Sequence, residues 1–523
     1  MARGQLPPHI EALLSPSAYP HPARRVELVQ THISYVLLAG DYVYKVKKPV
    51  DLGFLDYSTL EKRRFYCEEE VRLNRRLCPE AYLGVVPITS KGESVALAGT
   101  GEVVEYAVKM KRLPQERMME ALLEKDTVTS DMLTALTGKL AAFHRNSERS
   151  EHIDSFGGEE TIRANWQENF EQTQPYIGRT ISQQQWEATK GYVEAFLESA
   201  REMLRQRVYE GRIRDCHGDL RANAVCFEDG ICIFDCIEFN ERFRYGDVAS
   251  DLAFLAMDID FRGHRALADE MVGLYLAQSL DTTLPLVLPF YKCYRAFVRG
   301  KVDGFQLDQP EIPAQQRAAA QAGARRYFDL AEQYALRSCP PTLIAMVGAT
   351  GSGKSYLAYT LAGRLGAPVI SSDVVRKELA GLDPTHAQAE PVGAGIYSPD
   401  MTARTYDEMR RRAYPFLERR HPLILDATHL KREQRQKTKE LAQSMGIPFL
   451  AVECVATERL VRERLQQRQS AVWSPSDGRW EVYEAQMAGA EPLSDLPDRE
   501  RLTVDGSLPL SEQVERVLAR VGA

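Results

Sequence analysis

The residues best suited to chemistry in this 523-residue sequence form a glycine-rich stretch that ends in a lysine and a serine. The stretch reads Gly348, Ala349, Thr350, Gly351, Ser352, Gly353, Lys354 and Ser355, and it fits the pattern G-x-x-x-x-G-K-[S/T]. Glycines allow backbone N–H groups to wrap a polyphosphate, because a Cβ would block the necessary dihedral angles and the close approach. We therefore expect the loop to hold ATP, with Lys354 at the β- and γ-phosphates and Ser355 on Mg²⁺.

A second group of chemically suitable residues follows this loop, at the ends of apolar, strand-like runs. The segment PVISSDVVRKEL places Asp373 and Arg376 after one run, and HPLILDATHLKREQR ends another run at Asp426. In parallel sheets the carboxyl ends of the strands form the ligand-binding edge. There Asp373 can accept the proton of a substrate hydroxyl, Arg376 can hold the acceptor, and Asp426 can order the magnesium shell. The alternative is that Asp373 caps a helix and Arg376 is solvated.

Further polar residues are expected on the same rim. Thr428, Arg432 and Arg435 follow Asp426, and the helix-like segment ATERLVRERLQQRQ carries Arg459, Arg462, Arg464 and Arg468. Arg464 and Arg468 are four residues apart and share a helix face. We expect Thr428 and Arg432 to contact the acceptor, and this arginine pair to stabilise charge on the phosphoryl group in transfer. A solvated helix face is the alternative for each arginine.

The N-terminal part of the chain contains a separate pair of carboxylates. In CHGDLRANAVCFEDGICIFDCIEF, a predicted hairpin through residues 228–230 separates Asp219 from Asp235. Two carboxylates on adjacent strands can bracket a γ-phosphoryl group, one at the attacking oxygen and one at the cation. Upstream, Lys45 lies in the strand-like GDYVYKVKKP, and Glu70 lies in the helix-like FYCEEEVRLNRRL.

On these motifs, residues 25–335 resemble aminoglycoside phosphotransferases and other kinase-like small-molecule phosphotransferases. The resemblance implies that Asp219 is the catalytic base and that Asp235 binds Mg²⁺. It also implies that Lys45 binds the α- and β-phosphates and pairs with Glu70, with Glu69 as the second choice. AVKMKRL corresponds to the hinge between two lobes.

One position departs from that family. The family places a second metal-binding asparagine five residues after the catalytic aspartate, where this sequence has Ala224, and Asn223 stands one residue early. Either a local adjustment brings Asn223 to the metal or the site has one protein ligand fewer, which would make this half a slow kinase or a pseudokinase.

The residues around these motifs have structural interpretations. We expect His217 to brace the loop, Lys47 and Lys48 to form an exposed pair, Asp247 to bind the acceptor or anchor a loop, and Asp251 to cap a core helix.

The C-terminal half resembles the small P-loop kinases that include zeta-toxin-like, gluconate-kinase-like and polynucleotide-kinase-like domains. The resemblance rests on the phosphate loop, the SSDVVR segment, the LILDAT strand and the arginine-rich helix. It implies ATP-dependent phosphorylation of a hydroxyl on a small or nucleotide-like acceptor, with Asp373 as the base. No second acid follows Asp426, which argues against a hydrolysis-driven machine.

Hydrophobic patterning indicates the elements that position these residues. Short strand-like runs occupy residues 26–113, interrupted by one helix with an apolar side of Leu60, Phe65, Val71, Leu73 and Leu77. Residues 116–335 are mainly helical, and the prolines of LRSCPPTL mark a boundary near residue 340. Alternating strands and helices follow, as in a parallel sheet. We predict an α+β two-lobed kinase-like domain, with an N-lobe at 1–113 and a helical C-lobe at 114–337, followed by a three-layer α/β P-loop domain at 338–523.

Composition limits the classes of partner and compartment. The chain is 44% hydrophobic and 27% charged, with a formal net charge of −7, so nothing favours nucleic acid as a partner. The sequence has neither a signal-peptide core nor an apolar run of membrane-spanning length, and a cytoplasmic location is expected. Its nine cysteines are scattered and odd in number, so we expect buried free thiols, with a metal or disulfide role as the alternative.

The hypothesis that unites these observations is a bifunctional ATP-dependent phosphotransferase acting on hydroxyls of small molecules with Mg²⁺. Two alternatives stay open: a nucleotide-responsive regulatory protein whose first half is silent, and a P-loop kinase acting on nucleic-acid ends. The sequence leaves the acceptor and the oligomeric state undetermined.

Overall fold

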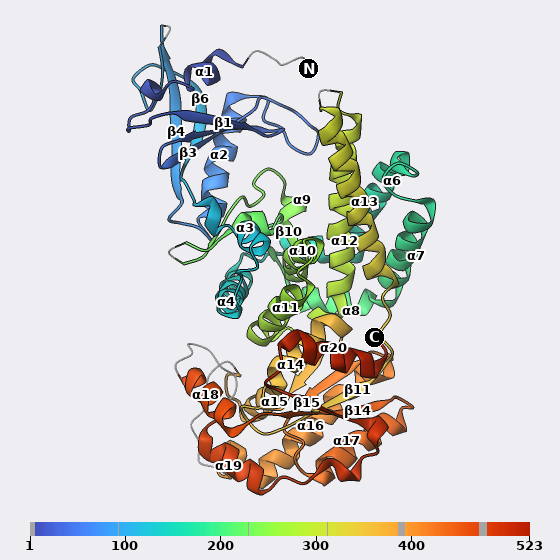
Figure 1. Ribbon diagram of the computed structural model, residues 1–523. Helices are drawn as coiled ribbons and strands as arrows, with labels where there is room; N and C mark the ends of the chain where they lie inside the picture. Colours follow the sequence, from blue (N-terminus) through green and yellow to red (C-terminus); the bar gives the residue numbers. More distant parts are fainter. Residues whose placement is uncertain (1–5, 93, 229, 311, 385–392, 470–477) are drawn as a thin grey trace. The chain divides into compact units, whose positions relative to one another are not determined.

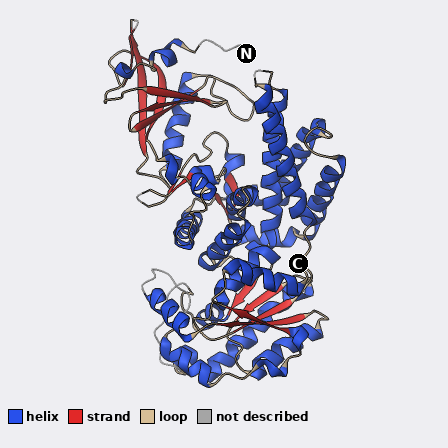
Figure 2. Cartoon of the chain, in the orientation of Figure 1, coloured by secondary structure: helices blue, strands red, loops and turns tan. Residues whose placement is uncertain are grey.

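The strand-like runs near the N-terminus form one antiparallel sheet of six strands in the computed structural model, which describes all residues except 1–5, 93, 229, 311, 385–392 and 470–477. The strands are β1 (Val26–Gln30), β2 (Ser34–Ala39), β3 (Tyr42–Lys47), β4 (Tyr82–Lys91), β5 (Ser94–Leu97) and β6 (Glu102–Lys111), in the order β1-β2-β3-β6-β4-β5. Figure 2 draws the strands of the chain in red. Because side chains alternate along a strand, Lys45 and Lys47 of β3 share one face of the sheet.

Helix α2 (Leu60–Asn74) stands between β3 and β4 in the chain (Figure 1). It begins at Thr59, whose side chain accepts a hydrogen bond from the backbone N–H of Lys62. The inner face buries Cys67, Glu70 and Val71. Phe65 was predicted to join this apolar side, but the prediction was wrong because Phe65 is 56% exposed on the outer face.

The C-lobe is helical, and two short strand pairs interrupt it. Its longer helices are α4 (Ser130–Asn146), α6 (Glu159–Thr173), α7 (Gln183–Ser199), α8 (Arg201–Tyr209), α10 (Val248–Phe261), α12 (Leu284–Phe305) and α13 (Ala314–Leu336). Strand β7 (Ile213–Asp215) pairs with β10 (Tyr245–Asp247), and β8 (Val225–Cys226) pairs with β9 (Cys232–Ile233), all antiparallel. These pairs fix the segment that carries Asp219 and Asp235.

The cap of α10 differs from the expectation. Asp247 is the N-cap, since its carboxylate accepts a hydrogen bond from the backbone N–H of Ala249, and it also pairs with the buried Arg207 at 2.6 Å. Asp251 lies one turn inside the helix and is 1% exposed, so the prediction that it caps the helix was wrong.

The chain divides into two compact units. The first comprises Met1–His264 and Phe290–Ala335, and the second comprises Arg265–Pro289 and Leu336–Ala523. The second unit therefore includes α11 (Arg265–Ser279), which the sequence analysis counted with the C-lobe. Within this unit α11 packs on α14 (Lys354–Leu365), where Arg364 and Asp269 form an ion pair at 2.6 Å.

A parallel sheet of five strands forms the centre of the second unit. The strands are β11 (Leu343–Val347), β12 (Val369–Ser371), β13 (Leu423–Asp426), β14 (Phe449–Val455) and β15 (Arg501–Asp505), in the order β12-β13-β11-β14-β15. Helices α14 and α20 (Leu510–Val521) cover one face, and α16 (Pro399–Glu418) and α17 (Arg432–Ser444) cover the other (Figure 1). This arrangement is the predicted three-layer fold.

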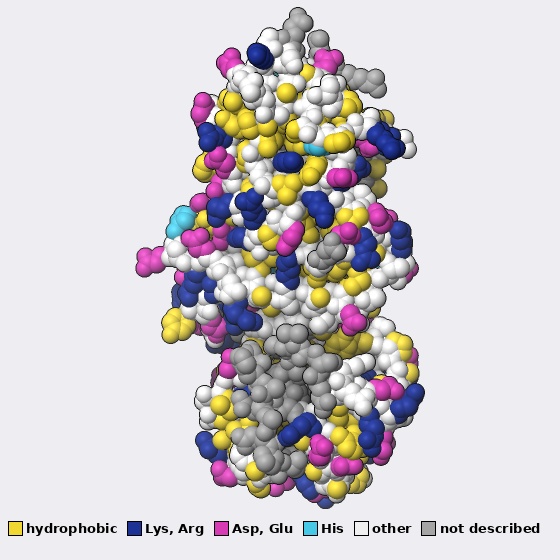
Figure 3. All heavy atoms as spheres, turned by 90° about the vertical axis from the view of Figure 1, so that its left-hand side faces the viewer, with side chains coloured by type: hydrophobic (Ala, Val, Ile, Leu, Met, Phe, Trp, Pro, Cys, Tyr) yellow, Lys and Arg dark blue, Asp and Glu magenta, His cyan; other side chains and the backbone are white. Residues whose placement is uncertain are grey.

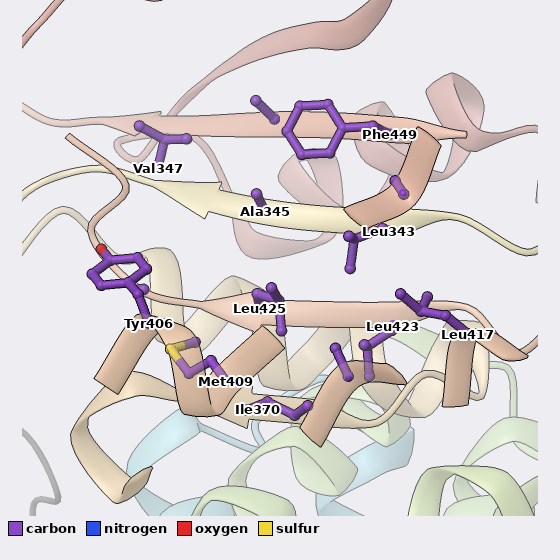
Figure 4. Close-up of a cluster of buried hydrophobic side chains, with 14 of the residues drawn as sticks. Leu343, Ala345, Val347, Ile370, Tyr406, Met409, Leu417, Leu423, Leu425 and Phe449 are labelled. Atoms are coloured by element: carbon purple, nitrogen blue, oxygen red, sulfur yellow. The ribbon is translucent and has the colours of Figure 1, made fainter. Parts of the chain in front are cut away.

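Coverage on both faces explains why the strands read as continuous apolar runs. Every residue of β11 is buried, and Leu343, Ala345 and Val347 project into one cluster with Leu425 and Met409 (Figure 4).

No helix in the described part of the chain is both long enough and apolar enough to span a bilayer. On the face drawn in Figure 3, basic and acidic side chains are interspersed over the described residues.

Candidate active sites

The glycine-rich loop of the second unit connects β11 to α14, which begins at Lys354. Gly348, Gly351 and Gly353 have φ of 143°, 79° and 98°, values that side chains disfavour. A Cβ on Gly348 would lie 2.7 Å from the carbonyl oxygen of Cys454. The loop therefore has the dihedral angles that the phosphate-binding pattern requires.

Arg464, on α18 (Glu458–Gln469), contacts this loop. Its guanidinium donates to the carbonyl oxygens of Ser352 at 3.0 Å and Gly506 at 2.7 Å. The side chain of its predicted companion, Arg468, lies outside the described residues. Two other arginines of this helix face elsewhere: Arg462 stacks on Trp480 at 3.4 Å, and Arg459 pairs with Glu463.

The parallel register brings the predicted carboxylates to one edge of the sheet. Asp426, at the end of β13, is level with Ser371 on one side and Met346 on the other. Asp373 lies in the first turn of α15 (Ser372–Leu379), immediately after β12. Burial, and then the charges of Asp426 and Asp373, raise the pKa of the Tyr359 phenol, so both carboxylates lie close to this one side chain.

A cavity of about 390 Å³ lies beside this edge. Its walls include Tyr359, Ser371 and Val374, together with Asp281 and Pro285 from the segment that follows α11. The volume is in the range of small-molecule pockets.

The residues predicted to hold the acceptor have separate surroundings. Arg376 is 7% exposed and donates to the carbonyl oxygen of Ile396 at 3.0 Å and to Thr402 Oγ1 at 3.2 Å. Thr428 Oγ1 lies 3.3 Å from the hydroxyl of Tyr406. Arg432 is exposed at the start of α17.

Arg435 does not lie on the rim, contrary to the expectation. It is fully buried, pairs with Asp495 at 2.6 Å and donates to the carbonyl oxygens of His429 and Pro492. It braces the interior because its position on α17 faces inward.

The sequence analysis missed two residues at this edge, Tyr406 and His429. The Tyr406 hydroxyl accepts from the backbone N–H of His429 at 3.0 Å, and His429 Nδ1 lies 2.9 Å from the carbonyl oxygen of Met346. Burial lowers the pKa of His429 to about 4, so its ring is neutral near pH 7. A histidine directly after Asp426-Ala-Thr was the available signal.

In the first unit, Lys45 contacts its predicted partner Glu70 and also Asp235, which was predicted only to bind Mg²⁺. Its Nζ lies 2.9 Å from Glu70 Oε1 and 2.8 Å from Asp235 Oδ1, whereas Glu69 pairs with Arg72. The charge of Lys45 holds the pKa of Asp235 at about 2, so this carboxylate is ionised. The lysine, the helix glutamate and the second aspartate of the loop pair thus form one electrostatic set.

Lys47 belongs to the same set, which the sequence analysis did not predict. It is 1% exposed, its Nζ lies 2.7 Å from Glu70 Oε2, and it pairs with Glu238, which also accepts from the Tyr57 hydroxyl at 2.6 Å. The exposed pair expected with Lys48 was wrong, because strand alternation places Lys47 inward with Lys45.

The loop that carries Asp219 is held in place by Asp251 of α10. The carboxylate of Asp251 accepts from the backbone N–H groups of His217 at 2.6 Å and Gly218 at 2.9 Å. His217 Nε2 lies 2.9 Å from the carbonyl oxygen of Phe234, which gives it the bracing contact expected of it. The Asp219 carboxylate receives two hydrogen bonds from Arg221, at 2.9 and 2.8 Å.

Asn223 lies on a 3-10 turn (Ala222–Ala224) and is exposed, while Ala224 is buried. No hydrogen bond among the described residues joins Asn223 to Asp235. That Asp235 and Asn223 together bind one Mg²⁺ therefore stays a prediction. The turn that carries Asn223 is a regular 3-10 turn.

The expectation of free thiols was wrong for one pair. Cys78, which follows α2, forms a disulfide with Cys232 of β9, 154 residues away, while the other seven cysteines are free. Spacing along the chain gave no signal, since only the packing of α2 against the hairpin brings the two together.

Comparisons with known proteins match both units. A family model described as "Phosphotransferase enzyme family" matches residues 66–286, and one described as "AAA domain" matches residues 343–493. The chain is 31% identical over 444 residues to "Uncharacterized protein Rv2004c" of Mycobacterium tuberculosis (strain ATCC 25618 / H37Rv), covering 85% of this chain and 86% of that protein. "Uncharacterized protein Mb2027c" of Mycobacterium bovis matches equally.

Solved structures resemble each part in fold. A gluconokinase from Sinorhizobium meliloti 1021 is 24% identical and covers 36% of this chain and 94% of its own, with a TM-score of 0.27. The amicoumacin kinase hAmiN is 12% identical and covers 61% of this chain and 92% of its own, with a TM-score of 0.36.

Proposed function

The chain belongs to the family of these mycobacterial proteins and joins two kinase-type domains into a phosphotransferase, and we propose that each domain transfers the γ-phosphoryl group of ATP to a hydroxyl of a small molecule. The two halves would then be two enzymes in one chain. The observation that carries the proposal is the contact of Lys45 with both Glu70 and Asp235, because it would give the first unit a nucleotide-binding set of its own, separate from the P-loop of the second.

In the P-loop half, the loop backbone and Lys354 hold the polyphosphate, and Ser355 and Asp426 hold the cation. Bound ATP supplies the phosphoryl group and Mg²⁺ neutralises its charge. Asp373 takes the proton of the acceptor hydroxyl while that oxygen bonds to the γ-phosphorus and the bond to the β–γ bridging oxygen breaks. Ser371 and Val374, which lie close to Asp373 in the chain, line the cavity that would receive the acceptor.

In the kinase-like half, Lys45 binds the α- and β-phosphates, and Glu70 fixes the lysine in position. Asp235 supplies the ionised carboxylate for Mg²⁺, and Asp219 accepts the proton of the acceptor hydroxyl. Arg221 holds the Asp219 carboxylate in position through its two hydrogen bonds.

One test separates the two halves. Wild type, Asp219→Asn, Lys354→Ala and the control Lys437→Ala are incubated with γ-labelled ATP and a metabolite extract, and labelled products are resolved. Lys437 is an exposed residue of α17 that pairs with Glu433, so its loss should leave every product in place. We expect Asp219→Asn and Lys354→Ala each to abolish a different labelled product. A single product lost only in Lys354→Ala would refute an active kinase-like half.

A product lost only in Lys354→Ala would favour a second candidate function, that of a nucleotide-responsive protein whose first half is catalytically silent. Ala224, at the position where the resembled family has its second metal ligand, favours it, since the site would then have one protein ligand fewer. Binding of ATP by the Lys354→Ala chain without turnover would support this candidate.

A further inference from the structure

Two half-buried cations near Asp219 in the C-lobe of the first unit form no ion pair with a carboxylate among the described residues. They are Arg295 and Lys301, both on α12. The other basic residues near them are paired: Arg242 with Glu168, Arg299 with Asp303, and Arg221 with Asp219. A half-buried cation whose hydrogen bonds go to neutral groups is suited to receive an anion.

Arg295 lies close to the loop that carries Asp219. Its guanidinium stacks over the ring of Phe254 at 4.7 Å, and Arg221, which holds Asp219, lies over the same ring at 5.8 Å. Within the described part of the chain, its side chain donates one hydrogen bond, to the neutral Ser250 Oγ at 3.0 Å. The Phe254 ring therefore holds the Arg295 guanidinium near Asp219, the predicted base, and leaves its charge without a counter-charge.

Lys301 extends the same cationic region. Its Nζ donates to two amide oxygens, Asn169 Oδ1 at 2.6 Å and Gln172 Oε1 at 2.8 Å. Burial lowers the pKa of Lys301 to about 8, although the charge of the nearby Glu168, which pairs with Arg242, raises it, so the ammonium is protonated near pH 7 and a further anion would stabilise it. Tyr294 lies between the two cations, because its ring lies 5.7 Å from the Arg295 guanidinium and its hydroxyl is close to Asn169, which binds Lys301.

We propose that Arg295 and Lys301 bind a phosphate group of the acceptor, so that the kinase-like half phosphorylates a molecule that is already a phosphate monoester. This inference rests on the function proposed above. A free hydroxyl of the monoester bonds to the γ-phosphorus, the bond to the β–γ bridging oxygen breaks, the hydroxyl proton passes to Asp219, and a bisphosphate and ADP result.

The two halves would then act in sequence, the P-loop half first and the kinase-like half second. The reaction that must supply the acceptor is phosphorylation of a hydroxyl, which is the reaction class proposed for the P-loop half. In the P-loop half, Arg376 donates its hydrogen bonds to the Ile396 carbonyl oxygen and to Thr402 Oγ1. Because this arginine is engaged within the protein, an uncharged acceptor suits the first step better than a phosphorylated one.

The first arm of the test measures binding of inorganic phosphate by calorimetry at fixed ionic strength. All chains carry Lys354→Ala, because the P-loop would otherwise bind the probe. In this background Arg295→Met should weaken phosphate binding by about tenfold to a hundredfold, the value of one charged hydrogen-bond partner. The control is Arg326→Met, which removes an arginine stacked at 4.2 Å on another ring of α10, Phe261, and should change binding less than twofold.

The second arm offers γ-labelled ATP with pairs of sugars or polyols and their monophosphates. We expect the Lys354→Ala chain to label monophosphates only, and Arg295→Met to raise KM for them about tenfold or more with kcat nearly unchanged.

Equal phosphate binding in Arg295→Met and its background would overturn the inference. So would labelling of the uncharged acceptors at a rate that Arg295→Met leaves unchanged, in which case the proposed function survives. Phosphate binding that depends on Arg295, without labelling of any acceptor, would sustain the anion site and refute the kinase-like half as an enzyme.

Discussion

Replacement of Lys47 by methionine tests whether this lysine is the buried counter-charge of two carboxylates. Lys47 has no exposed side-chain surface, and its partners Glu70 and Glu238 have 1% and 5%. Methionine has a similar length and no charge, so both carboxylates would lose their common partner in a region that water does not reach. Breaking a buried pair in this way costs about 3–5 kcal/mol.

The assay is calorimetric unfolding of the full chain, followed in the transition of the first unit. At roughly 2 °C per kcal/mol for a unit of this size, the midpoint should fall by about 6–10 °C. The neighbouring Lys48→Met is the matched control, since Lys48 bonds to the carbonyl oxygen of Thr31 outside this network and its loss should cost about 1 kcal/mol or less.

A double variant separates the lost ion pair from a general packing defect. Adding Glu238→Gln to Lys47→Met removes one orphaned charge, so the pair should cost less than the sum of the single variants. If Lys47→Met lowers the midpoint no more than Lys48→Met, Lys47 is not a buried counter-charge and the reasoning fails.

Three further outcomes are expected. Burial holds the pKa of His429 near 4, against about 6.5 when unfolded, so the unfolded state binds more protons between these two values. The free energy of unfolding of the second unit should therefore fall by about 2–3 kcal/mol from pH 7 to pH 4, and by clearly less in His429→Asn, as urea unfolding at each pH would measure. In the Lys354→Ala background, Lys45→Met should lower kcat/KM of the remaining turnover by about 10²–10³, and an unchanged value would exclude Lys45 from the nucleotide site. Alkylation of the unfolded, unreduced chain should modify seven cysteines by mass spectrometry and nine after reduction, whereas nine without reduction would exclude the bond between Cys78 and Cys232.

The sequence predicted the elements whose signals are local. The glycine-rich loop, the apolar strand that ends at Asp426 and the alternation of strand and helix are written in neighbouring residues, and the predicted three-layer fold is confirmed. The two-lobed kinase-like fold is confirmed for the same reason, since its strand runs and loop motifs are each contained within a few dozen residues. The sequence motifs also indicated Glu70 as the partner of Lys45, and the fold places them within 3 Å of each other. The contact of Lys45 with Asp235, which was expected only to bind Mg²⁺, was not predicted.

Tertiary structure alone decided the environment of single side chains. Strand alternation allowed Lys47 to face inward, but the two carboxylates that make this burial tolerable come from residues 23 and 191 positions away. Arg435 became an interior brace because Asp495, 60 residues later, lies opposite it. The bond between Cys78 and Cys232 likewise joins segments that have no common pattern.

The same distinction applies to the proposed anion site. Arg295 is an ordinary arginine in a helical sequence, and nothing near it in the chain distinguishes it from Arg299. Phe254 and Arg221, from separate parts of the C-lobe, place its charge beside Asp219, and the absence of a carboxylate opposite it, among the described residues, leaves that charge for a ligand. Local patterns determine which elements form, whereas the charge balance of a site depends on which distant side chains the fold brings together.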